Sequence, residues 1–361
     1  MRTTIDEVTR LAAASEPLVI KRLDDDDPAA VARWDAFVQA CPEGTFFHRS
    51  GWQRILREVF GHATHFLYAE RAGVVQGVLP LAQVKSRLFG NSLASLPFAV
   101  YGGVAASTPL AVEALEREAQ ATAGRLRVDH LEMRNLRQRH PEWPTQALYV
   151  SFRKEIAPNV EENMQAIPRK QRAMVRKGIK NGLRSEIDPD PGRFFALYAD
   201  NVHRHGTPAL PRRYFDALQR VFADDCEVLT VVDGAGRSLS SVLSFYFRDE
   251  VLPYYAGDAL SARELAANDF KYWELMRRSC ERGLKVFDYG RSKQGTGSYA
   301  FKKNWGFEPQ PLFYEYCLYR RDAIPQNNPS NVKYRLLINT WRRMPIGLAN
   351  WLGPFIVRNL G

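Results

Sequence analysis

The chain has 361 residues, more than one hydrophobic core usually supports, so its length predicts two domains of ordinary size. Hydrophobic residues make up 45% and charged residues 25%, a balance that excludes disordered and collagen-like proteins. The formal net charge of +10 favours anionic partners, such as nucleic acids, phospholipid head groups or lipid-linked pyrophosphates. The four cysteines form no CxxC pair, which excludes a zinc knuckle and a disulfide framework.

The N-terminal residues Met1 to Asp6 lack the basic and then apolar pattern of a signal peptide. No stretch approaches the ~20 apolar residues that a helix needs to cross a bilayer. We therefore expect a cytoplasmic protein.

The first half of the sequence predicts one domain, residues 1–156. Expected helices are one that opens at Pro28, 50–60 and 109–125, and expected strands are 64–70, 74–85, 93–104, 130–134 and 147–152. The turn at Ala72 and Gly73 makes the first two strands a hairpin. Pro97, Gly102 and Gly103 make 93–104 an irregular strand with a bulge near a site.

The second half predicts another domain, residues 157–322. Expected helices are 168–181, 193–202, one from Pro211, 263–282 and 298–304, and expected strands are 227–232, 239–247, 251–257, 285–289 and 312–319. Short polar turns between the first three strands indicate an antiparallel meander. The first half has a comparable element order, which indicates a weak internal duplication.

The tail, residues 323–361, mixes arginines and lysine with tryptophan and leucine. This composition is typical of a helix that lies peripherally on the inner face of an anionic membrane. A terminal helix that docks on the body of the protein is the alternative.

Three neighbouring segments carry the most informative motif. They are Asp288-Tyr289-Gly290-Arg291-Ser292, Gly295-Thr296-Gly297-Ser298-Tyr299 and Phe301-Lys302-Lys303-Asn304-Trp305-Gly306-Phe307. In this order they resemble the FemAB-like branch of the GNAT superfamily, where a strand ending in D-x-G-R-S leads through a glycine-rich loop to F-K-x-x-W/F-G. Further segments that fit this family are Pro253–Gly257, Asn268, Trp273, Arg204–Gly206, Thr45–His48, Gly77–Leu81 and Ser95–Phe98. Those in the first half look like members found with exosortase (PEP-CTERM) exopolysaccharide systems.

The resemblance covers nearly the whole chain and implies an α+β fold of tandem GNAT-like domains, each a mixed, largely antiparallel sheet flanked by helices. It implies a cofactor-free transferase that moves an activated acyl or aminoacyl group to an amine or hydroxyl of a cell-envelope or exopolysaccharide precursor, without a covalent enzyme intermediate. The implied donor is aminoacyl-tRNA. The sequence lacks the long coiled-coil arm of staphylococcal Fem proteins, so an acyl-CoA or acyl-carrier donor with a lipid-linked or sugar acceptor is the enzymatic rival.

Acyl transfer requires donors placed where negative charge develops on the carbonyl oxygen. By resemblance this role, or that of neutralising a donor phosphate, falls to Lys302 rather than Lys303. Tyr254 or Tyr255 would orient the acceptor or relay a proton. Successive strand residues face opposite sides, so we expect only one of the two tyrosines to point into the cleft. The alternative is that both are aromatic residues of the sheet core.

Other residues are candidates for substrate binding. Arg204 and Arg291 would hold a phosphate or carboxylate with two hydrogen bonds, and Asn268 and Tyr299 fit the family pattern. The usual GNAT pyrophosphate loop is absent, because residues 258–264 contain no glycine. Gly295 and Gly297 either contact a different donor or form a tight turn.

The helix that begins near Pro168 carries a basic stripe. Its members are Arg169, Arg172, Arg176 and Lys180, with Lys170 and Lys177 beside them and no acid between. The stripe would grip tRNA phosphates or a polyprenyl-pyrophosphate head group, or it is simply a solvated helix face.

His62 and His65, like His203 and His205, lack the companion ligands of a metal site, so we expect no bound metal. No G-x-S-x-G elbow is present, which argues against a serine triad. A second class of hypothesis is a non-catalytic, membrane-associated scaffold that uses the basic stripe and the tail to organise polysaccharide assembly.

Overall fold

The computed structural model describes residues 16–86, 90–325 and 332–359. Contacts divide these residues into two compact units, one extending to Gln146 and including Phe313–Ile324, the other comprising Ala147–Leu312 and the residues from Pro325 on. Each unit is a mixed, largely antiparallel sheet flanked by helices, so the predicted α+β class is confirmed. Among the described helices, none combines the length and apolar character needed to cross a bilayer.

The sheet of the first unit has the order β1-β2-β3-β4-β6-β15-β7, with β5 paired to β3. Its strands are β1 (Val19–Arg22), β2 (Ala63–Arg71), β3 (Val74–Ser86), β4 (Gly90–Ser95), β5 (Ala105–Ala106), β6 (His130–Asn135), β7 (Thr145–Gln146) and β15 (Phe313–Leu318). The predicted hairpin is confirmed as β2 and β3. The strand expected at 93–104 ends at Ser95, and the rest of that segment is largely irregular.

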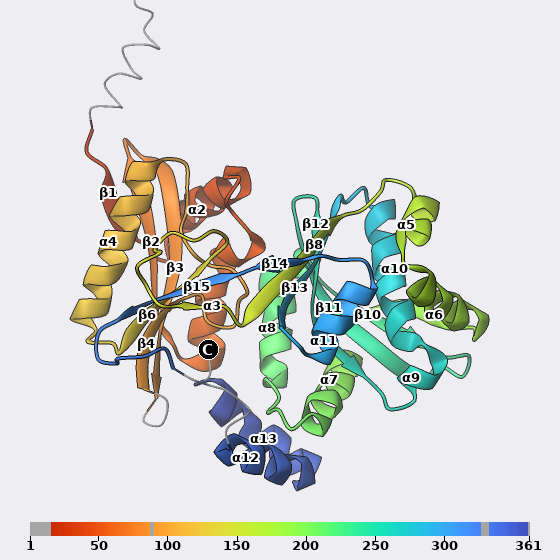
Figure 1. The fold of residues 1–361 in the computed structure, drawn as a ribbon. Coiled ribbons are helices and arrows are strands. Elements are labelled where there is room, and N and C mark those ends of the chain that lie inside the picture. The colour runs from red at the N-terminus through yellow and green to blue at the C-terminus, as the bar shows by residue number, and fades with distance from the viewer. Residues whose placement is uncertain (1–15, 87–89, 326–331, 360–361) are drawn as a thin grey trace, which may run out of the picture. The chain divides into compact units, whose positions relative to one another are not determined.

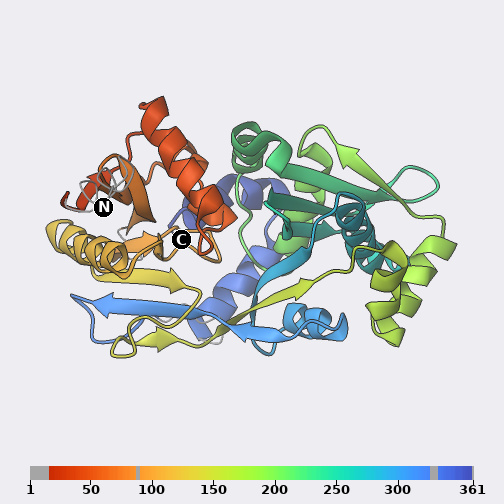
Figure 2. The same cartoon turned by 90° about the horizontal axis from the view of Figure 1, so that it is seen from above.

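Helices cover both faces of this first sheet (Figures 1 and 2). They are α2 (Pro28–Ala40), the 3-10 turn η1 (Phe46–His48), α3 (Gly51–Ile55), the π-helical turn η2 (Leu56–Phe60) and α4 (Pro109–Arg125). Asp27 caps α2 by accepting hydrogen bonds from the backbone of Ala29 and Ala30. Leu67 packs in the core with α4, whereas Phe66 stacks on Trp34 of α2, as alternation along β2 requires.

The sheet of the second unit has the order β14-β8-β13-β12-β11-β10-β9. Its strands are β8 (Tyr149–Glu155), β9 (Arg184–Asp188), β10 (Cys226–Val232), β11 (Ser238–Phe247), β12 (Glu250–Asp258), β13 (Val286–Lys293) and β14 (Pro309–Pro311). The predicted meander is confirmed as β10, β11 and β12. Strands β12 and β13 are parallel and pair only at Glu250–Val286 and Val251–Phe287.

Helices of the second unit pack on both faces of its sheet. They are α5 (Val160–Ala166), α6 (Arg169–Lys180), α7 (Gly192–Arg204), α8 (Arg212–Phe222), η3 (Ala223–Asp225), α9 (Ala262–Leu265), α10 (Ala267–Glu281), α11 (Gly297–Asn304), α12 (Val332–Arg343) and α13 (Ile346–Val357). One face of the sheet packs on α6 and α10 through Leu229 and Val242. The opposite face packs on α7 and α8, where Phe245 contacts Phe222. Figure 1 shows both groups beside the sheet.

Two strands lie in a different sheet from the one we expected. The strand expected at 147–152 to complete the first domain is β8, which pairs with β13 and β14 of the second unit. The strand expected at 312–319 to complete the second is β15, which pairs with β6 and β7 of the first. The physical reason is the burial of Glu315, whose carboxylate accepts hydrogen bonds from Asn135 and from the backbone of Arg139 and His140.

Helix α7 crosses strand β12 at Gly257, where the two backbones touch. A β-carbon at this position would overlap the backbone nitrogen of Tyr198. Only glycine therefore allows the helix to lie this close to the strand.

We expect Gly257→Ala to push α7 from the sheet and to lower the stability of the protein by about 1–3 kcal/mol, the usual cost of overpacking. Thermal unfolding followed by circular dichroism measures the loss. Gly234→Ala is the matched control, because a β-carbon at Gly234 meets no atom within 4 Å. Equal melting temperatures for the two variants would contradict this account of the contact.

Candidate functional site

The segment from β13 to α11 positions Lys302. A bulge interrupts β13 between Asp288 and Arg291, where Gly290 has a left-handed φ of 63° and donates its backbone N–H to the Asp288 carboxylate. A bulge bends its strand, and this one begins directly after the two residue pairs that join β13 to β12. Thr296 then caps α11, whose last turn carries Lys302.

Lys302 is buried, with 8% of its surface exposed, and its ammonium group is fully occupied. The Nζ atom donates to the carbonyl oxygens of Tyr289 at 2.7 Å, Gly290 at 3.1 Å and Arg291 at 3.1 Å. The three carbonyl oxygens match the three donors of a charged lysine. Lys302 therefore fastens α11 to the bulge of β13.

Two effects oppose each other at Lys302. Burial lowers the pKa of Lys302 to about 7, and the nearby Asp288 carboxylate offsets part of this decrease. The three carbonyl contacts favour the ammonium form, because the neutral amine has only two N–H donors. With a pKa of about 7 the two forms coexist at neutral pH, and the carbonyl contacts hold the charged one.

Tyr254 and Tyr255 lie on one face of β12, so the strict alternation on which we based the expectation for these two residues does not hold here. The register of β11 and β12 shifts between Leu243 and Ser244, and Tyr254 is the extra residue of the bulge. Their ring centroids are 4.8 Å apart. The Tyr255 hydroxyl lies 3.1 Å from that of Tyr214, and burial raises the pKa of Tyr255 well above its usual range.

The structure does not join Lys302 to these tyrosines. Tyr255 packs on Tyr198 and Phe215 of α7 and α8, whereas the Lys302 ammonium lies near the rings of Phe152 and Tyr289 on β8 and β13. In the described part of the chain, no hydrogen bond or ring contact links Lys302 to either tyrosine.

Several predicted binding residues gather around the β13–α11 turn. The Arg291 guanidinium lies 4.6 Å from the ring centroid of Tyr149, and its carbonyl oxygen binds Lys302. Tyr299 packs edge-on against Phe152, and Gly295, with a φ of 75°, allows the tight turn before α11. Gly297 is the first residue of α11.

The remaining predicted binding residues lie elsewhere in the second unit. Arg204 binds the Asp200 carboxylate at 2.9 Å and the carbonyl oxygen of Asp258. Asn268 lies half-buried in the first turn of α10. The α6 stripe faces outward, since Arg169 and Arg176 are exposed, and Arg172 bonds to Gln165.

A pocket of about 110 Å³ in the first unit was missed by sequence reasoning. It lies where the η1 turn, the loop after β4 and the residues after β6 meet. Its lining includes His48, Tyr101, Gly102, Gly103, Asn135 and Arg139. The resemblance motifs Thr45–His48 and Ser95–Phe98 were the signal for it, because one supplies His48 and the other begins the loop.

The walls of this pocket are held by buried polar groups. His48 accepts a hydrogen bond from the backbone of Thr45 at Nδ1, so its Nε2–H donates to Gly103 O at 2.8 Å. Arg134 donates to the carbonyl oxygens of Leu96 and Ala99, which fixes a loop whose Leu96 has a φ of 56°. Backbone strain of this kind persists only where the surroundings enforce it.

The pocket presents both hydrogen-bond acceptors and hydrogen-bond donors. The buried Asn135 Oδ1 has no hydrogen-bond partner. At the rim, Arg139 binds Glu43 at 3.0 Å, and Arg137 is exposed. Such a lining suits a polar or anionic group with hydroxyls.

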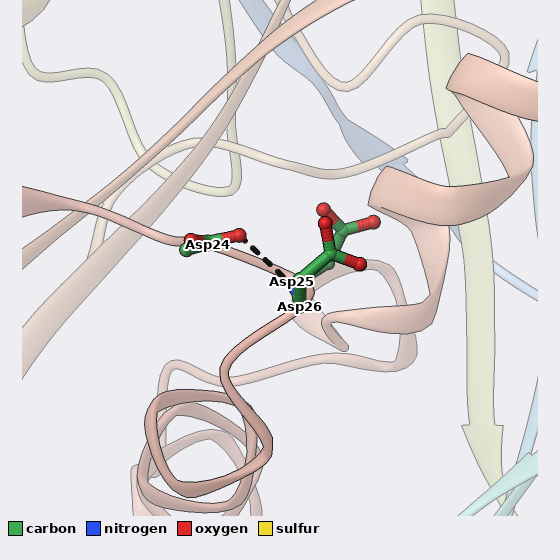
Figure 3. A group of neighbouring side chains, drawn as sticks. All are labelled: Asp24, Asp25 and Asp26. Atoms are coloured by element: carbon green, nitrogen blue, oxygen red, sulfur yellow. Dashed lines mark hydrogen bonds between the residues drawn. The ribbon is translucent and has the colours of Figure 1, made fainter.

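The histidine pairs do not assemble a metal site. Burial lowers the pKa of His65 to about 4, while His62 stacks on Phe60. His203 Nε2 donates to Met344 O at 2.9 Å. Asp24, Asp25 and Asp26 bring carboxylates near one another, as Figure 3 shows, but the group is largely exposed and Asp25 pairs with Arg57. We assign no metal to these three acids.

Comparisons with known proteins identify the second unit most clearly. Residues 169–303 match the family described as acetyltransferase (GNAT) domain. No curated protein matches the chain. The solved structure of FemX is similar with a TM-score of 0.62 and 16% identity, over 82% of this chain and 97% of FemX.

Two further structures share the fold. L-PGS from Bacillus licheniformis has a TM-score of 0.52 and 12% identity, over 90% of this chain and 99% of its own. A tandem GNAT protein from the clavulanic acid biosynthesis pathway has a TM-score of 0.51 and 12% identity, over 85% of this chain and 100% of its own. The predicted tandem GNAT-like fold is therefore confirmed. At this coarse level, a GNAT acyltransferase-type domain supports a transferase.

Proposed function

We propose that this protein transfers an activated acyl or aminoacyl group to an amine or hydroxyl of a cell-envelope or exopolysaccharide precursor, without a covalent enzyme intermediate. The observation that carries the proposal is the parting of β12 and β13 after Val251 and Phe287, inside the region that matches the GNAT family. From that point the backbone of β12 lacks β13 as a partner on that side. Backbone N–H groups on that edge of β12 would bind the carbonyl oxygen of the donor.

Lys302 would support this reaction by charge and position. Its three ammonium protons bind carbonyl oxygens of the β13 bulge, so it has no donor left for a direct hydrogen bond to the substrate. It would hold the bulge that bends β13 away from β12, and its buried positive charge would stabilise the oxyanion or a donor phosphate. The motif resemblance implies the same role for Lys302, which here would act through its charge without touching the substrate.

The tyrosines of β12 would act on the acceptor. The high pKa of Tyr255, caused by burial, keeps its hydroxyl protonated, and that hydroxyl is engaged with Tyr214. Tyr254 would therefore orient the acceptor, with Tyr255 fixing its ring. A hydroxyl in this place would act as a hydrogen-bond donor rather than a general base.

The pocket of the first unit would be a binding site for a small polar ligand. Its volume of about 110 Å³ and its polar lining suit a sugar or a carboxylate. The unpartnered Asn135 Oδ1 and the Arg137 guanidinium at the rim favour a ligand with both hydroxyl and negative groups. A link to exosortase-type exopolysaccharide systems is the finer form of this proposal, and it rests on the motif resemblance alone.

The donor would be aminoacyl-tRNA rather than acyl-CoA. The connection from β12 to α9 contains no glycine to cradle a pyrophosphate. In contrast, α6 presents Arg169, Lys170, Arg176 and Lys180 to solvent on one helix. A row of exposed cations suits a phosphate backbone.

We expect Lys302→Ala to lower the rate of transfer about 10²–10³-fold, as loss of an electrostatic stabiliser does. Lys303→Ala is the matched control, because Lys303 is the exposed neighbour on the same helix, and it should retain wild-type activity. Transfer of radiolabel from aminoacyl-tRNA or acyl-CoA to lipid-linked sugars measures both. If a folded Lys302→Ala protein keeps full activity, the role proposed for Lys302 fails, whereas absence of transfer by the wild type would favour the non-catalytic scaffold.

Lys302 should also couple stability to pH. Burial lowers the pKa of Lys302 from 10.5 to about 7. Between these two pH values, the unfolded chain therefore binds a proton that the folded chain has lost. The free energy of unfolding of the wild type, relative to Lys302→Met, should therefore rise as pH increases from 7 towards 10. Urea unfolding at several pH values tests this. A difference that stays flat would indicate that the carbonyl contacts keep Lys302 charged throughout.

Neutralising the α6 stripe separates the two donors. Arg169→Gln, Arg176→Gln and Lys180→Gln together should weaken tRNA binding and reduce its salt dependence, by about 0.7–0.9 per lost phosphate contact in the logarithmic slope. Lys85→Gln, Arg117→Gln and Arg127→Gln remove the same charge from exposed sites of the first unit and serve as the control. Equal loss in both triple variants would show a general charge effect and remove α6 from the donor site.

A further inference from the structure

Helix α13 docks on the second unit through its small residues. Ala349 and Gly353 are buried, and a β-carbon at Gly353 would lie 3.1 Å from the carbonyl oxygen of Ala209. At the start of the helix, His203 holds the carbonyl oxygen of Met344, and Arg342 donates to that of His205. Figure 1 shows α12 and α13 as a pair near α7. The docked helix was one of the two alternatives for the tail.

The outward face of α13 is made of large apolar side chains. Trp351 is 65% exposed, Phe355 59% and Leu348 44%. Spacings of three and four residues place them on one side of the helix, and the Trp351 and Phe355 rings are 6.1 Å apart. A surface helix normally turns its large apolar residues inward. Here the small residues face the protein and the large ones face solvent.

The charges of the tail itself have one sign. Arg342, Arg343 and Arg358 are exposed at the two ends of α13. Residues 323–361 contain no aspartate or glutamate. An apolar ridge between arginines complements a surface that is apolar within and anionic at its edge.

We propose that α13 lies in the plane of an anionic phospholipid surface, with Leu348, Trp351 and Phe355 inserted and Arg343 and Arg358 at the phosphates. The helix has 12 residues, or about 18 Å, so it would lie on the bilayer rather than cross it. The inference goes beyond the proposed function, because it holds whatever group the protein transfers.

A protein partner is the less favoured occupant. A stable protein interface takes about 20–30 residues from each side, whereas the exposed ridge consists of a few side chains on one helix. The absence of acids from residues 323–361 also favours lipid phosphates, since protein interfaces commonly pair both signs of charge.

The full-length protein should bind vesicles of phosphatidylcholine with phosphatidylglycerol and should bind pure phosphatidylcholine vesicles much more weakly. Trp351 supplies a direct signal, because the other six tryptophans are buried or half-buried, so its emission should shift to the blue on binding. Absence of binding to the anionic vesicles would overturn the proposal.

Paired variants test the two parts of the surface. Trp351→Ser with Phe355→Ser should weaken vesicle binding at least about ten-fold, since each inserted ring contributes apolar area. Arg343→Gln with Arg358→Gln should weaken it about 25-fold, or about five-fold per arginine. Leu110→Ser with Leu260→Ser removes two exposed apolar side chains from other sites and should leave binding unchanged.

Two results would overturn the inference. One is equal vesicle binding by the Trp351→Ser, Phe355→Ser protein, with its melting temperature unchanged. The other is self-association of the wild type in sedimentation, lost in that variant, without any vesicle binding. The second result would assign the ridge to a copy of the same chain.

Discussion

The second unit depends on the contact between one lysine and one bulge. Three carbonyl oxygens of β13 turn toward a single point, and buried carbonyl groups must find donors. Lys302 satisfies all three from α11. The bulge bends β13 just where its pairing with β12 stops, so the lysine maintains the separation of two parallel strands. Fold and proposed chemistry therefore depend on the same side chain.

The first unit uses a comparable device on a larger scale. Arg134 binds two carbonyl oxygens of the irregular loop after β4, and Glu315 binds two backbone N–H groups after β6. Both side chains are buried, and each replaces the partners that a regular strand would supply. The loop and the pocket beside it are thus fixed by charge, so the pocket would be rigid.

Local patterns in the sequence predicted local structure well. The β2–β3 hairpin and the meander of β10 to β12 both follow from residues close together in the chain. Strand β9 was missed, because Arg184–Asp188 is a polar edge strand in which only Asp188 is buried. The helix expected at 263–282 is interrupted at Ala266, whose φ is 60°. Nothing local in the sequence marks either feature.

Long-range features could not be predicted. The exchange of β8 and β15 depends on pairing between strands more than a hundred residues apart, and the pocket is built from three separate segments. The side-chain direction of Tyr254 depends on a register shift relative to β11, which alternation alone does not reveal. The motif around Lys302 singled out this residue as a candidate, and its burial and three carbonyl contacts, which the motif does not reveal, determine how it would act.

The most direct test of the central claim is a crystal structure of the protein with a non-hydrolysable analogue of the acyl donor. We expect the acyl carbonyl oxygen to accept a hydrogen bond from a backbone N–H of β12 beyond Val251, while Lys302 keeps its three carbonyl partners. An analogue that binds elsewhere would contradict this mechanism, provided that substitutions at its binding position abolish activity.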